Sequence, residues 1–481
     1  MIAVVPSLEV VAWSHDYGRI DLTPWVTSCR TTKSLDSTTG DWSVTMRRRS
    51  GIEVLGVLKD DDWVTITSGG VPVMVGPIDT VRRTRSATQS GGVDVDHAIV
   101  GRDFARCFQS EGVFAPLLEG LKEPGVYDFR ALNRIFEAKG QPTTDLIIGN
   151  TLVKPDEALR RLMSVVLSGD FLFWKLPTTL APTDLYGVLR YLGEHPEGIV
   201  WHPDPYVSTR RTSIHEILSA PFRSPFTEFF YDLLDTKHHG QSHPGDFWTP
   251  PPLSAGTQWS RFVPTLVYRT IPFDAADWGR LPLHEVTADE VTADDLGTSG
   301  GDRYHVFAAT MATFTQDGSV GVWGTSKGRV PAVAAKAAEI HGLRWLELDN
   351  PQMYPDQNSQ ARIIEDTARL WRWYWGMAES WSGGLTIARS RPEIRIGDRL
   401  SYEGRHYYIQ QVGHSWDVGA GAGEVTETTT AQVVRGLPPG HRAPEIEPWD
   451  YPKPEVVYEP LPEAPIMFEE PFDTGLPPVV A

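Results

Sequence analysis

Histidines and carboxylates gather in one loop, the sequence's best candidate for a metal site. Asp235, His238, His239, His243 and Asp246 carry ligand atoms that zinc and other divalent ions accept. Their spacing matches no known ligand signature, and the loop around them is rich in proline and glycine. The pattern therefore favours a solvated polar loop, and we predict neither a bound metal nor a cofactor.

A hydrolytic nucleophile has one formal match. Residues 297–301, GTSGG, fit the G-x-S-x-G pattern around Ser299. A nucleophile elbow needs a strand before the match and a helix after it. An acidic polar stretch precedes it here and the strand-like run YHVFAATMATF (304–314) follows, so a glycine-rich turn is favoured. Phosphate-loop, dinucleotide, H-E-x-x-H and C-x-x-C motifs are all missing from the sequence.

Carboxylates cluster twice along the chain. Residues 60–62, DDD, precede the strand-like WVTIT and read as a charged turn. Four more acids lie in the local repeat EVTADEVTADDL (285–296): Asp289, Glu290, Asp294 and Asp295. A glycosidase needs two carboxylates that face each other across a cleft, and a chain with 62 acidic residues contains many chance pairs. We therefore predict no catalytic residue.

Arginines and aromatic residues also form short clusters. Residues 47–49 and Arg82, Arg83 and Arg85 lie in or beside strand-like segments with no basic surround. This favours pairing with acids on another subunit over nucleic-acid binding. The aromatic stripe could stack on sugars, but its helical spacing favours core packing. Its members are Trp371, Trp373, Tyr374, Trp375 and Trp381.

Composition narrows the class of protein. The 481 residues include 44 basic and 62 acidic side chains, a net charge of −18, with 41% hydrophobic residues. This is too apolar for global disorder and too acidic for a broad phosphate-binding surface. Cys29 and Cys107 cannot form a disulfide framework. The first residues lack a basic segment and contain Pro6 and Glu9, so we expect a strand there and synthesis in a cytoplasm without secretion.

Hydrophobic periodicity predicts a mainly β chain with α+β insertions. The first β region spans 1–108, with strands at 25–33, 42–49, 63–67, 71–76 and 93–101. A mixed α/β insertion spans 109–225, with helices at 154–167 and 213–220. The second β region comprises 226–314 and 379–436, with strands at 226–234, 262–271, 304–314, 383–389, 393–402, 405–416 and 424–436. A helical insertion spans 315–378, with helices at 330–342 and 359–375. In the second helix, spacing places Ile364, Ala368, Trp371 and Trp375 on one apolar face.

Residues 437–481 differ from the rest of the chain. They hold 12 prolines, nine acidic residues and two basic ones. Such a segment favours extended polyproline geometry and cannot fold alone. Its regularly placed aromatic residues nevertheless indicate an arm that docks on a neighbouring surface, with a disordered acidic tail as the alternative. The candidate anchors of this arm are Trp449, Tyr451, Tyr458, Phe468 and Phe472.

Several segments together resemble phage baseplate hub proteins. The most specific is GGLTIARSRPEIRIGDRLSYEGRHYYIQQVGHSW, followed by a Gly-rich turn and TTTAQVVRG, within 383–436. PTLVYRTIPFDAADW (264–278) carries an R-x-x-P-F element, and VLKDDDWVTIT with VPVMVGPIDTV (57–81) is similar to the first hub barrel. The resemblance covers most of 20–436, and these motifs are structural rather than catalytic.

The resemblance implies two tail-tube-like antiparallel β-barrels per chain, which assemble as a homotrimer into a pseudo-sixfold ring. That ring would join the tail tube protein to the central spike protein, contact other baseplate proteins, and surround a channel for the tape-measure protein and DNA. The protein would then reside in the virion tail, with no membrane-spanning segment. Gly397 and Asp398 would form the turn that opens a barrel strand. Tyr407, Ile409 and Gln411 would face one side of the next strand, and Tyr408, Gln410 and Val412 the other.

Three functions remain open from the sequence. The first is this structural hub, in a phage or in a phage-derived contractile injection system. The second is a tail-associated cell-wall or polysaccharide hydrolase, which lacks a convincing nucleophile or metal site. The third is an aromatic-rich carbohydrate-binding β-protein.

Overall fold

The computed structural model describes 14 segments of the chain. They are residues 8–47, 54–87, 93–110, 112–113, 176–180, 190–193, 212–219, 226–235, 262–310, 312–314, 320–322, 332–349, 359–418 and 425–446. The chain divides into two units, Met1–Glu447 and Pro448–Ala481, and every described residue belongs to the first. The helix expected at 154–167 and most of the expected insertion 109–225 lie outside these segments.

The first β region contains seven described strands. They are β1 (Leu8–Ser14), β2 (Gly18–Asp21), β3 (Val26–Ser34), β4 (Asp41–Arg47), β5 (Trp63–Ser68), β6 (Val71–Ala87) and β7 (Val93–Arg102). Short helices η1 (Thr23–Trp25), α1 (Val54–Val57) and α2 (Arg106–Ser110) lie between or after them. The five strands expected here are confirmed, because alternating β-branched and aromatic residues suit a half-buried sheet.

The second β region is built mainly from C-terminal strands. They are β13 (Leu283–Glu285), β14 (Val291–Gly297), β20 (Trp381–Ile387), β21 (Arg399–Tyr402), β22 (Arg405–Val418) and β23 (Val425–Leu437). Beside it, β11 (Thr227–Asp235) and β12 (Phe262–Thr270) form a sheet with β9 (Arg190–Gly193). Helices α7 (Ile214–Ser219) and α9 (Ala275–Arg280) and the turn η5 (Ala288–Glu290) connect these parts, and β8 (Gly112–Val113) pairs with β10 (Thr212–Ser213).

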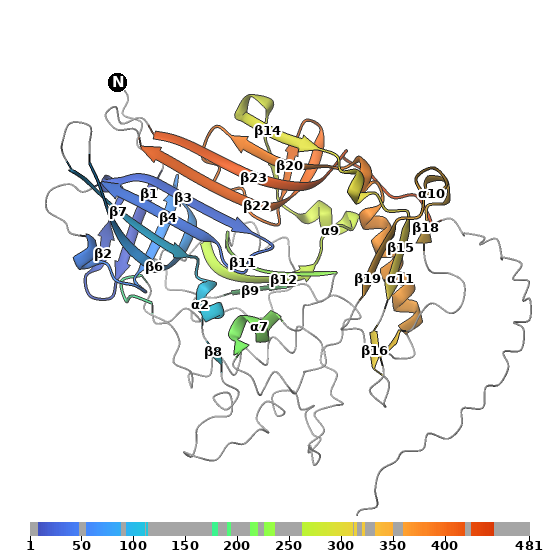
Figure 1. The fold of residues 1–481 in the computed structure, drawn as a ribbon, viewed down its shortest axis with the longest axis horizontal. Helices are drawn as coiled ribbons and strands as arrows, with labels where there is room; N and C mark the ends of the chain where they lie inside the picture. Colours follow the sequence, from blue (N-terminus) through green and yellow to red (C-terminus); the bar gives the residue numbers. More distant parts are fainter. Residues whose placement is uncertain are drawn as a thin grey trace, which may run out of the picture. The chain divides into compact units, whose positions relative to one another are not determined.

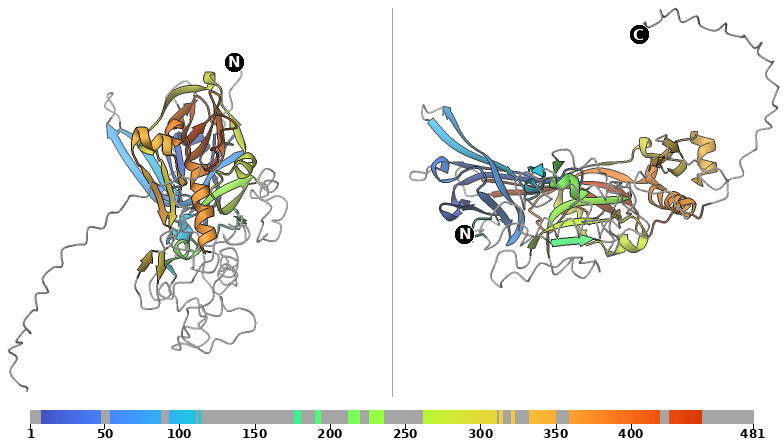
Figure 2. Two further views of the ribbon diagram at one scale, coloured as in Figure 1. Left: turned by 90° about the vertical axis from the view of Figure 1, so that its right-hand side faces the viewer. Right: turned by 90° about the horizontal axis from the view of Figure 1, so that it is seen from below.

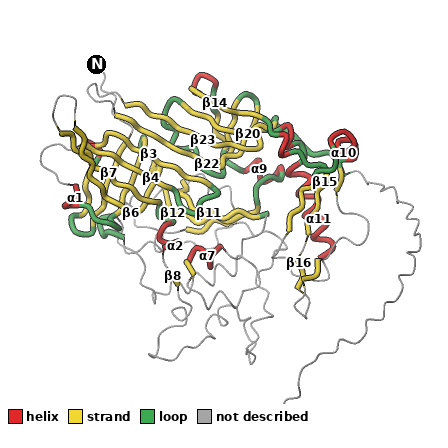
Figure 3. Tube along the Cα trace, in the orientation of Figure 1, coloured by secondary structure: helices red, strands yellow, loops and turns green. Residues whose placement is uncertain are grey.

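Both regions belong to one 13-stranded sheet (Figures 1 and 3). Its order is β14-β20-β23-β22-β3-β4-β7-β6-β5-β1-β2, with β21 on β22 and β13 on β21. The two regions join where β22 pairs antiparallel with β3, from Gln411 opposite Ser34 to Asp417 opposite Ser28. The expectation of two closed barrels is therefore corrected: among the described strands the path ends at β14 and β2, and no pairing closes either region. The join uses backbone bonds between residues far apart in sequence, which periodicity cannot reveal.

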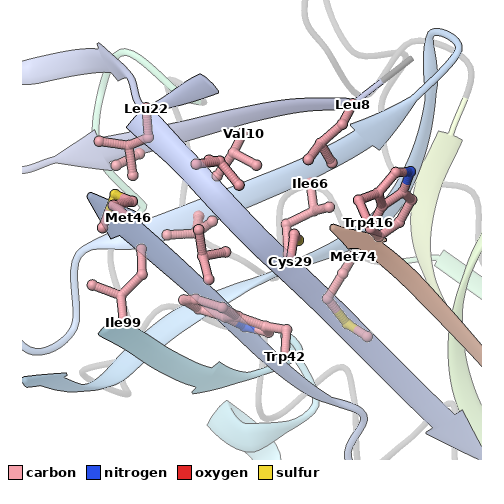
Figure 4. Close-up of a cluster of buried hydrophobic side chains, with 14 of the residues drawn as sticks. Leu8, Val10, Leu22, Cys29, Trp42, Met46, Ile66, Met74, Ile99 and Trp416 are labelled. Atoms are coloured by element: carbon pink, nitrogen blue, oxygen red, sulfur yellow. The ribbon is translucent and has the colours of Figure 1, made fainter. Parts of the chain in front are cut away.

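Each region nevertheless encloses its own apolar core. In the first, side chains of β1 and β5 pack with those of β3, β4, β6 and β7, as Figure 4 shows. Trp416 of β22 reaches into this core and is fully buried. The second core gathers apolar side chains of β11, β12, β20, β21, β22 and β23. Each β region thus curves around its own apolar core without closing into a barrel.

A third part of the structure combines a small sheet with one long helix. Strands β18 (Ala332–Val333), β15 (Val306–Thr310) and β19 (Trp345–Asp349) pair side by side. Helix α11 (Ser359–Tyr374) packs on β15. Around them lie η6 (Gly300–Asp302), α10 (Ala335–His341), η7 (Met377–Glu379) and the pair β16 (Ala312–Phe314) and β17 (Val320–Val322). None of the described helices is long and apolar enough to cross a membrane.

Three local expectations about this part change. The strand expected at 304–314 divides into β15 and β16, which belong to different sheets. The helix expected at 330–342 begins only at Ala335, after the strand β18. On α11, Trp371 is buried as expected, but Ile364 is 40% exposed while Leu370 and Trp373 are fully buried. The buried face is thus rotated from the expected one, because Phe226 and Phe273 also pack on this helix.

Strand β22 does not alternate simply along its length. Its pairing with β23 shifts register between Ile409 and Gln411, so Gln410 is an extra residue in a β-bulge. Val412 therefore joins Tyr407 and Ile409 in the second core, whereas strict alternation would place it on the opposite face. The expected division into two faces is right for Tyr407 and Ile409 and wrong for Val412.

Candidate assembly site at the junction of the two β regions

Arg269 is the centre of a buried polar junction. It lies near the end of β12, and its guanidinium forms an ion pair with Glu228 of β11. The same group donates to the Gly397 carbonyl at 2.9 Å and to the Tyr408 hydroxyl at 3.2 Å. Burial alone disfavours the charged form, but Glu228 and Tyr408 outweigh it and raise the pKa of Arg269. Arg269 is therefore a fixed cation that ties β11 and β12 to β22.

Tyr408 completes this junction. Its hydroxyl lies 2.6 and 2.8 Å from the two carboxylate oxygens of Glu228, to which it donates. Burial, together with the Glu228 charge, raises the pKa of Tyr408 well above its usual value. The phenol consequently stays protonated and acts as a hydrogen-bond donor. A charge-assisted bond of this length is stronger than one between neutral groups.

Phe273 packs against the ring of Tyr408, whose hydroxyl contacts Glu228. The Phe273 ring packs edge-on against Tyr408 at 5.2 Å and against Trp373 of α11 at 5.9 Å. The Arg435 guanidinium lies 4.3 Å from the Phe273 ring centroid and donates to the Trp373 carbonyl. Burial lowers the pKa of Arg435 to about 10. The long helix is thereby fixed to the second β region.

The turn at Gly397 requires glycine. Its φ is +77°, and a Cβ there would lie 2.7 Å from the Arg269 guanidinium. Asp398 contacts His284 at 2.8 Å, and Arg399 donates to the Leu281 carbonyl at 2.7 Å. The expectation that this turn opens a strand is confirmed, since β21 begins at Arg399.

A second buried network joins the first β region to β11. Lys33 of β3 forms an ion pair with Asp103 and lies 3.7 Å from Asp232 of β11. Arg395 lies 3.8 Å from the same Asp232 oxygen, Oδ1, and donates to the Pro72 carbonyl at 2.5 Å. Two cations and two carboxylates therefore balance where each side chain is at most 10% exposed. Burial raises the pKa of Asp103 despite the favourable charge of Lys33.

His414 borders this network. It is fully buried, and its Nδ1 lies 3.1 Å from the Thr429 hydroxyl, which accepts the Arg391 N–H. Burial, reinforced by the positive charge of Arg395, lowers the pKa of His414 to about 3. A small cavity of about 20 Å³ is lined by His414, Lys33, Asp232 and Arg395, among others. A neutral histidine beside two cations avoids a third positive charge.

Several residues first considered for catalysis hold turns or ion pairs, whereas Asp289 and Asp295 are exposed. Asp62 accepts the His15 and Lys59 N–H groups, each at 3.0 Å, and orders the turn before β5, as expected of a charged turn. Glu290 closes a capping box with Thr287 and pairs with Arg391 at 3.0 Å. These carboxylates are thus engaged in turns and ion pairs.

Some of the remaining candidates also make structural contacts, and others lie outside the described residues. Asp294 accepts the Tyr402 hydroxyl at 2.9 Å. Ser299 accepts the Gly301 N–H, in a turn that leads to η6 rather than to a long helix. Trp371 and Trp375 stack at 4.5 Å in the core around α11, which confirms packing for that pair. Asp235 ends β11, and its proposed metal partners lie outside the described residues, as do all five arm anchors. Within the described ranges, no three His, Cys, Asp or Glu side chains lie close enough to hold a metal ion.

The buried charges are the residues that periodicity missed. Glu228 and Asp232 interrupt the apolar run FTEFFYDLLD, and Arg269 interrupts FVPTLVYRT. A charged residue inside an apolar strand is a signal for a buried partner, because an unpaired buried charge is very costly. The sequence contains that signal, but it does not say which charge pairs with which.

The described fold is mainly β, and the chain is structurally similar to phage tail proteins. One is the 43 kDa tail protein of prophage MuSo2 from Shewanella oneidensis, with 13% identity, 89% of this chain and 97% of that chain covered, and a TM-score of 0.46. Another is the tail protein from Neisseria meningitidis, with 11% identity, 89% and 96% covered, and a TM-score of 0.45. A Francisella PdpA–VgrG complex matches with 8% identity, 92% and 54% covered, and a TM-score of 0.38. No protein-family model and no curated protein matches the sequence. At these identities the likeness concerns the fold alone.

Proposed function

We propose that this chain is the structural baseplate hub of a phage tail. In this role it forms a trimeric, pseudo-hexameric ring that links the tail tube to the central spike and surrounds the path of DNA and the tape-measure protein. The chain acts through rigid assembly rather than catalysis. Two tube-like β regions in each of three copies supply the six similar units that such a ring needs.

The observation that carries the proposal is the convergence of the hub-like motifs. The R-x-x-P-F element contributes Arg269 and Phe273, and I-R-I-G-D-R-L contributes Gly397. Y-Y-I-x-x-V contributes Tyr408, and V-V-R-G contributes Arg435. Motifs that lie up to 166 residues apart thus hold one another in place. Together these motifs make the junction rigid, and a ring that transmits force along the tail requires rigid subunits.

Two further features support this role. Outside residues 437–481 the chain retains an excess of acidic groups, and a negative channel wall would let DNA pass without being held. Residues 437–446 lie against the body, since Ala443 packs on the α11 core and the Trp371 indole donates to the Pro444 carbonyl at 2.8 Å. The remaining acidic arm, with its five aromatic anchors, would reach a neighbouring baseplate protein or the spike. Helices α10 and α11 would face outward, toward peripheral baseplate proteins.

The decisive experiment measures assembly. The mass of the purified chain in solution should be that of a trimer, about 160 kDa from a 53.5 kDa chain, and imaging of the tail end should place it between tube and spike. A monomer that clears cell-wall substrate would instead support the hydrolase and refute the hub. A trimer in a particle without a genome would identify the injection-system variant.

A further inference from the structure

Strands β6 and β7 form a two-stranded ribbon that is rich in arginine. Beyond the first core, the ribbon and the adjoining end of β4 hold four arginines: Arg47, Arg82, Arg83 and Arg85. Two aspartates, Asp94 and Asp96, lie on the same ribbon, so it is positive in a chain whose net charge is −18. In the right-hand view of Figure 2, the ends of β6 and β7 extend past the neighbouring strands.

Register places these arginines on both faces of the ribbon. Arg82 pairs with Ala98, and Arg47 pairs with Asp96 two positions along, so Arg47 and Arg82 share the outer face. Arg85 lies on the opposite face, beyond the buried Met46 and His97. Arg47, Arg82 and Arg85 are exposed, and none has an ion pair or hydrogen bond among the described residues.

The complementary surface lies at one edge of the sheet. Residues 285–297 contain five acids and no basic residue. Glu290 is paired with Arg389 and Arg391, and Asp294 accepts the Tyr402 hydroxyl. Asp289 and Asp295 are exposed and make no ion pair or side-chain hydrogen bond within the described part of the chain. Among the described strands β14 pairs only with β20, so its outer edge is open.

Within one copy these two surfaces make no ion pair or hydrogen bond with each other among the described residues. Five strands, β20, β23, β22, β3 and β4, separate β14 from β7 in the order of the sheet. A ring needs a head-to-tail interface, in which two different surfaces of one chain meet on adjacent copies.

We propose that the arginine ribbon of one copy, with Arg47 and Arg82 on its outer face, docks against the acidic edge strand β14 of the next copy, with Asp289 and Asp295. This inference rests on the proposed ring and names the surfaces that form it. The charges steer and orient the contact, and the open backbone edge of β14 adds hydrogen bonds. Because the charges are exposed, salt screens them over about 10 Å at 0.1 M.

Charge reversal tests the pairing in the full-length chain by sedimentation equilibrium. The ribbon variant is Arg47→Glu with Arg82→Glu, and the edge variant is Asp289→Lys with Asp295→Lys. Each should raise the trimer dissociation constant at least about tenfold, because like charges then face each other. The four-site swap restores opposite charges and should return the constant to within about threefold of wild type.

A matched control makes the same change in net charge as the ribbon variant at another place. Arg30 and Arg442 are exposed and make no side-chain hydrogen bond or ion pair among the described residues, so Arg30→Glu with Arg442→Glu should leave the trimer intact. If the ribbon variant behaves like this control, or the four-site swap is weaker than either double variant, the pairing is wrong. A wild-type chain that is monomeric at all concentrations overturns the ring itself, whereas a stable wild-type trimer with inert reversals overturns only this interface.

Discussion

Replacing Arg269 with methionine tests whether the buried junction holds the two sheets together. The change removes the ion pair with Glu228 and the hydrogen bonds to the Gly397 carbonyl and the Tyr408 hydroxyl. The Glu228 side chain, only 12% exposed, is left without its cation. An orphaned buried charge costs about 3–5 kcal/mol. Tyr408 still donates to Glu228, so we expect the free energy of unfolding to fall by about 3 kcal/mol, at the lower end of that range.

The assay should report locally, because a chain of several parts need not unfold in one step. Hydrogen exchange of the Gly397 and Ile409 amides is suited to this, since they donate to the Ile409 and Asp398 carbonyls. A loss of about 3 kcal/mol would speed exchange at these amides by roughly a hundredfold if they open through the junction. Urea unfolding followed by tryptophan fluorescence gives the parallel global measurement.

Two variants make the result interpretable. Arg280→Met removes an exposed arginine 3.4 Å from Asp277 and should cost under about 0.5 kcal/mol. Adding Glu228→Gln to Arg269→Met removes the orphaned charge, so the double variant should recover at least about half of the loss. The reasoning fails if Arg269→Met is no worse than Arg280→Met, or if the double variant is as unstable as the two single losses added together.

Four other predictions concern separate parts of the molecule. The pKa of His414 is lowered by burial to about 3, below the usual 6.5, so the unfolded chain takes up the proton first as pH falls. Stability should therefore decline from pH 7 to pH 5 by about 2 kcal/mol through this group, and His414→Asn should flatten that decline in urea titrations. Gly383→Ala should detach β14 from β20, measured as faster amide exchange in β14, because the new Cβ would lie 1.8 Å from the Asp295 carbonyl oxygen; Gly279→Ala, with open space around it, is the control. Deleting 447–481 should leave the trimer intact in sedimentation but abolish co-purification with the spike or a neighbouring baseplate protein; unfolded β regions would show that the arm belongs to the core. A DNA affinity column at about 0.1 M salt should not retain the protein, and firm retention would contradict a non-binding channel wall.

Local pattern predicted the strands well and their arrangement poorly. Strands β3, β4 and β5 were expected within a few residues of where they lie, because alternation and turn residues act over short distances. The pairing of β22 with β3 joins residues nearly 400 positions apart, and no local signal specifies it. The bulge at Gln410 was missed for the same reason, because the partner strand decides which residue is left unpaired.

The junction was visible in the sequence only in part. The hub-like motifs pointed to Gly397 and to the R-x-x-P-F element, and the glycine turn is confirmed by its positive φ. The contact between them depends on the third dimension, since Arg269 and Gly397 are 128 residues apart. Lys33 and Asp232 carried no motif. Arg395 belongs to I-R-I-G-D-R-L, but that motif does not indicate its partners, so the shared network follows from packing.

The second buried network is better explained by specificity than by added stability. Removing charges from water is costly, and a balanced buried set contributes little net free energy compared with apolar side chains of similar size. An apolar interface, however, tolerates sliding, whereas the Asp232 charge is balanced only where Lys33 of the first region and Arg395 of the second lie 3.7 and 3.8 Å from its Oδ1. The Arg395 guanidinium also requires the Pro72 and Val73 carbonyls, which fixes its position along β6. The network therefore selects one relative placement of the two β regions, and a subunit of the proposed ring would need that single placement because any angular error would be repeated in every copy.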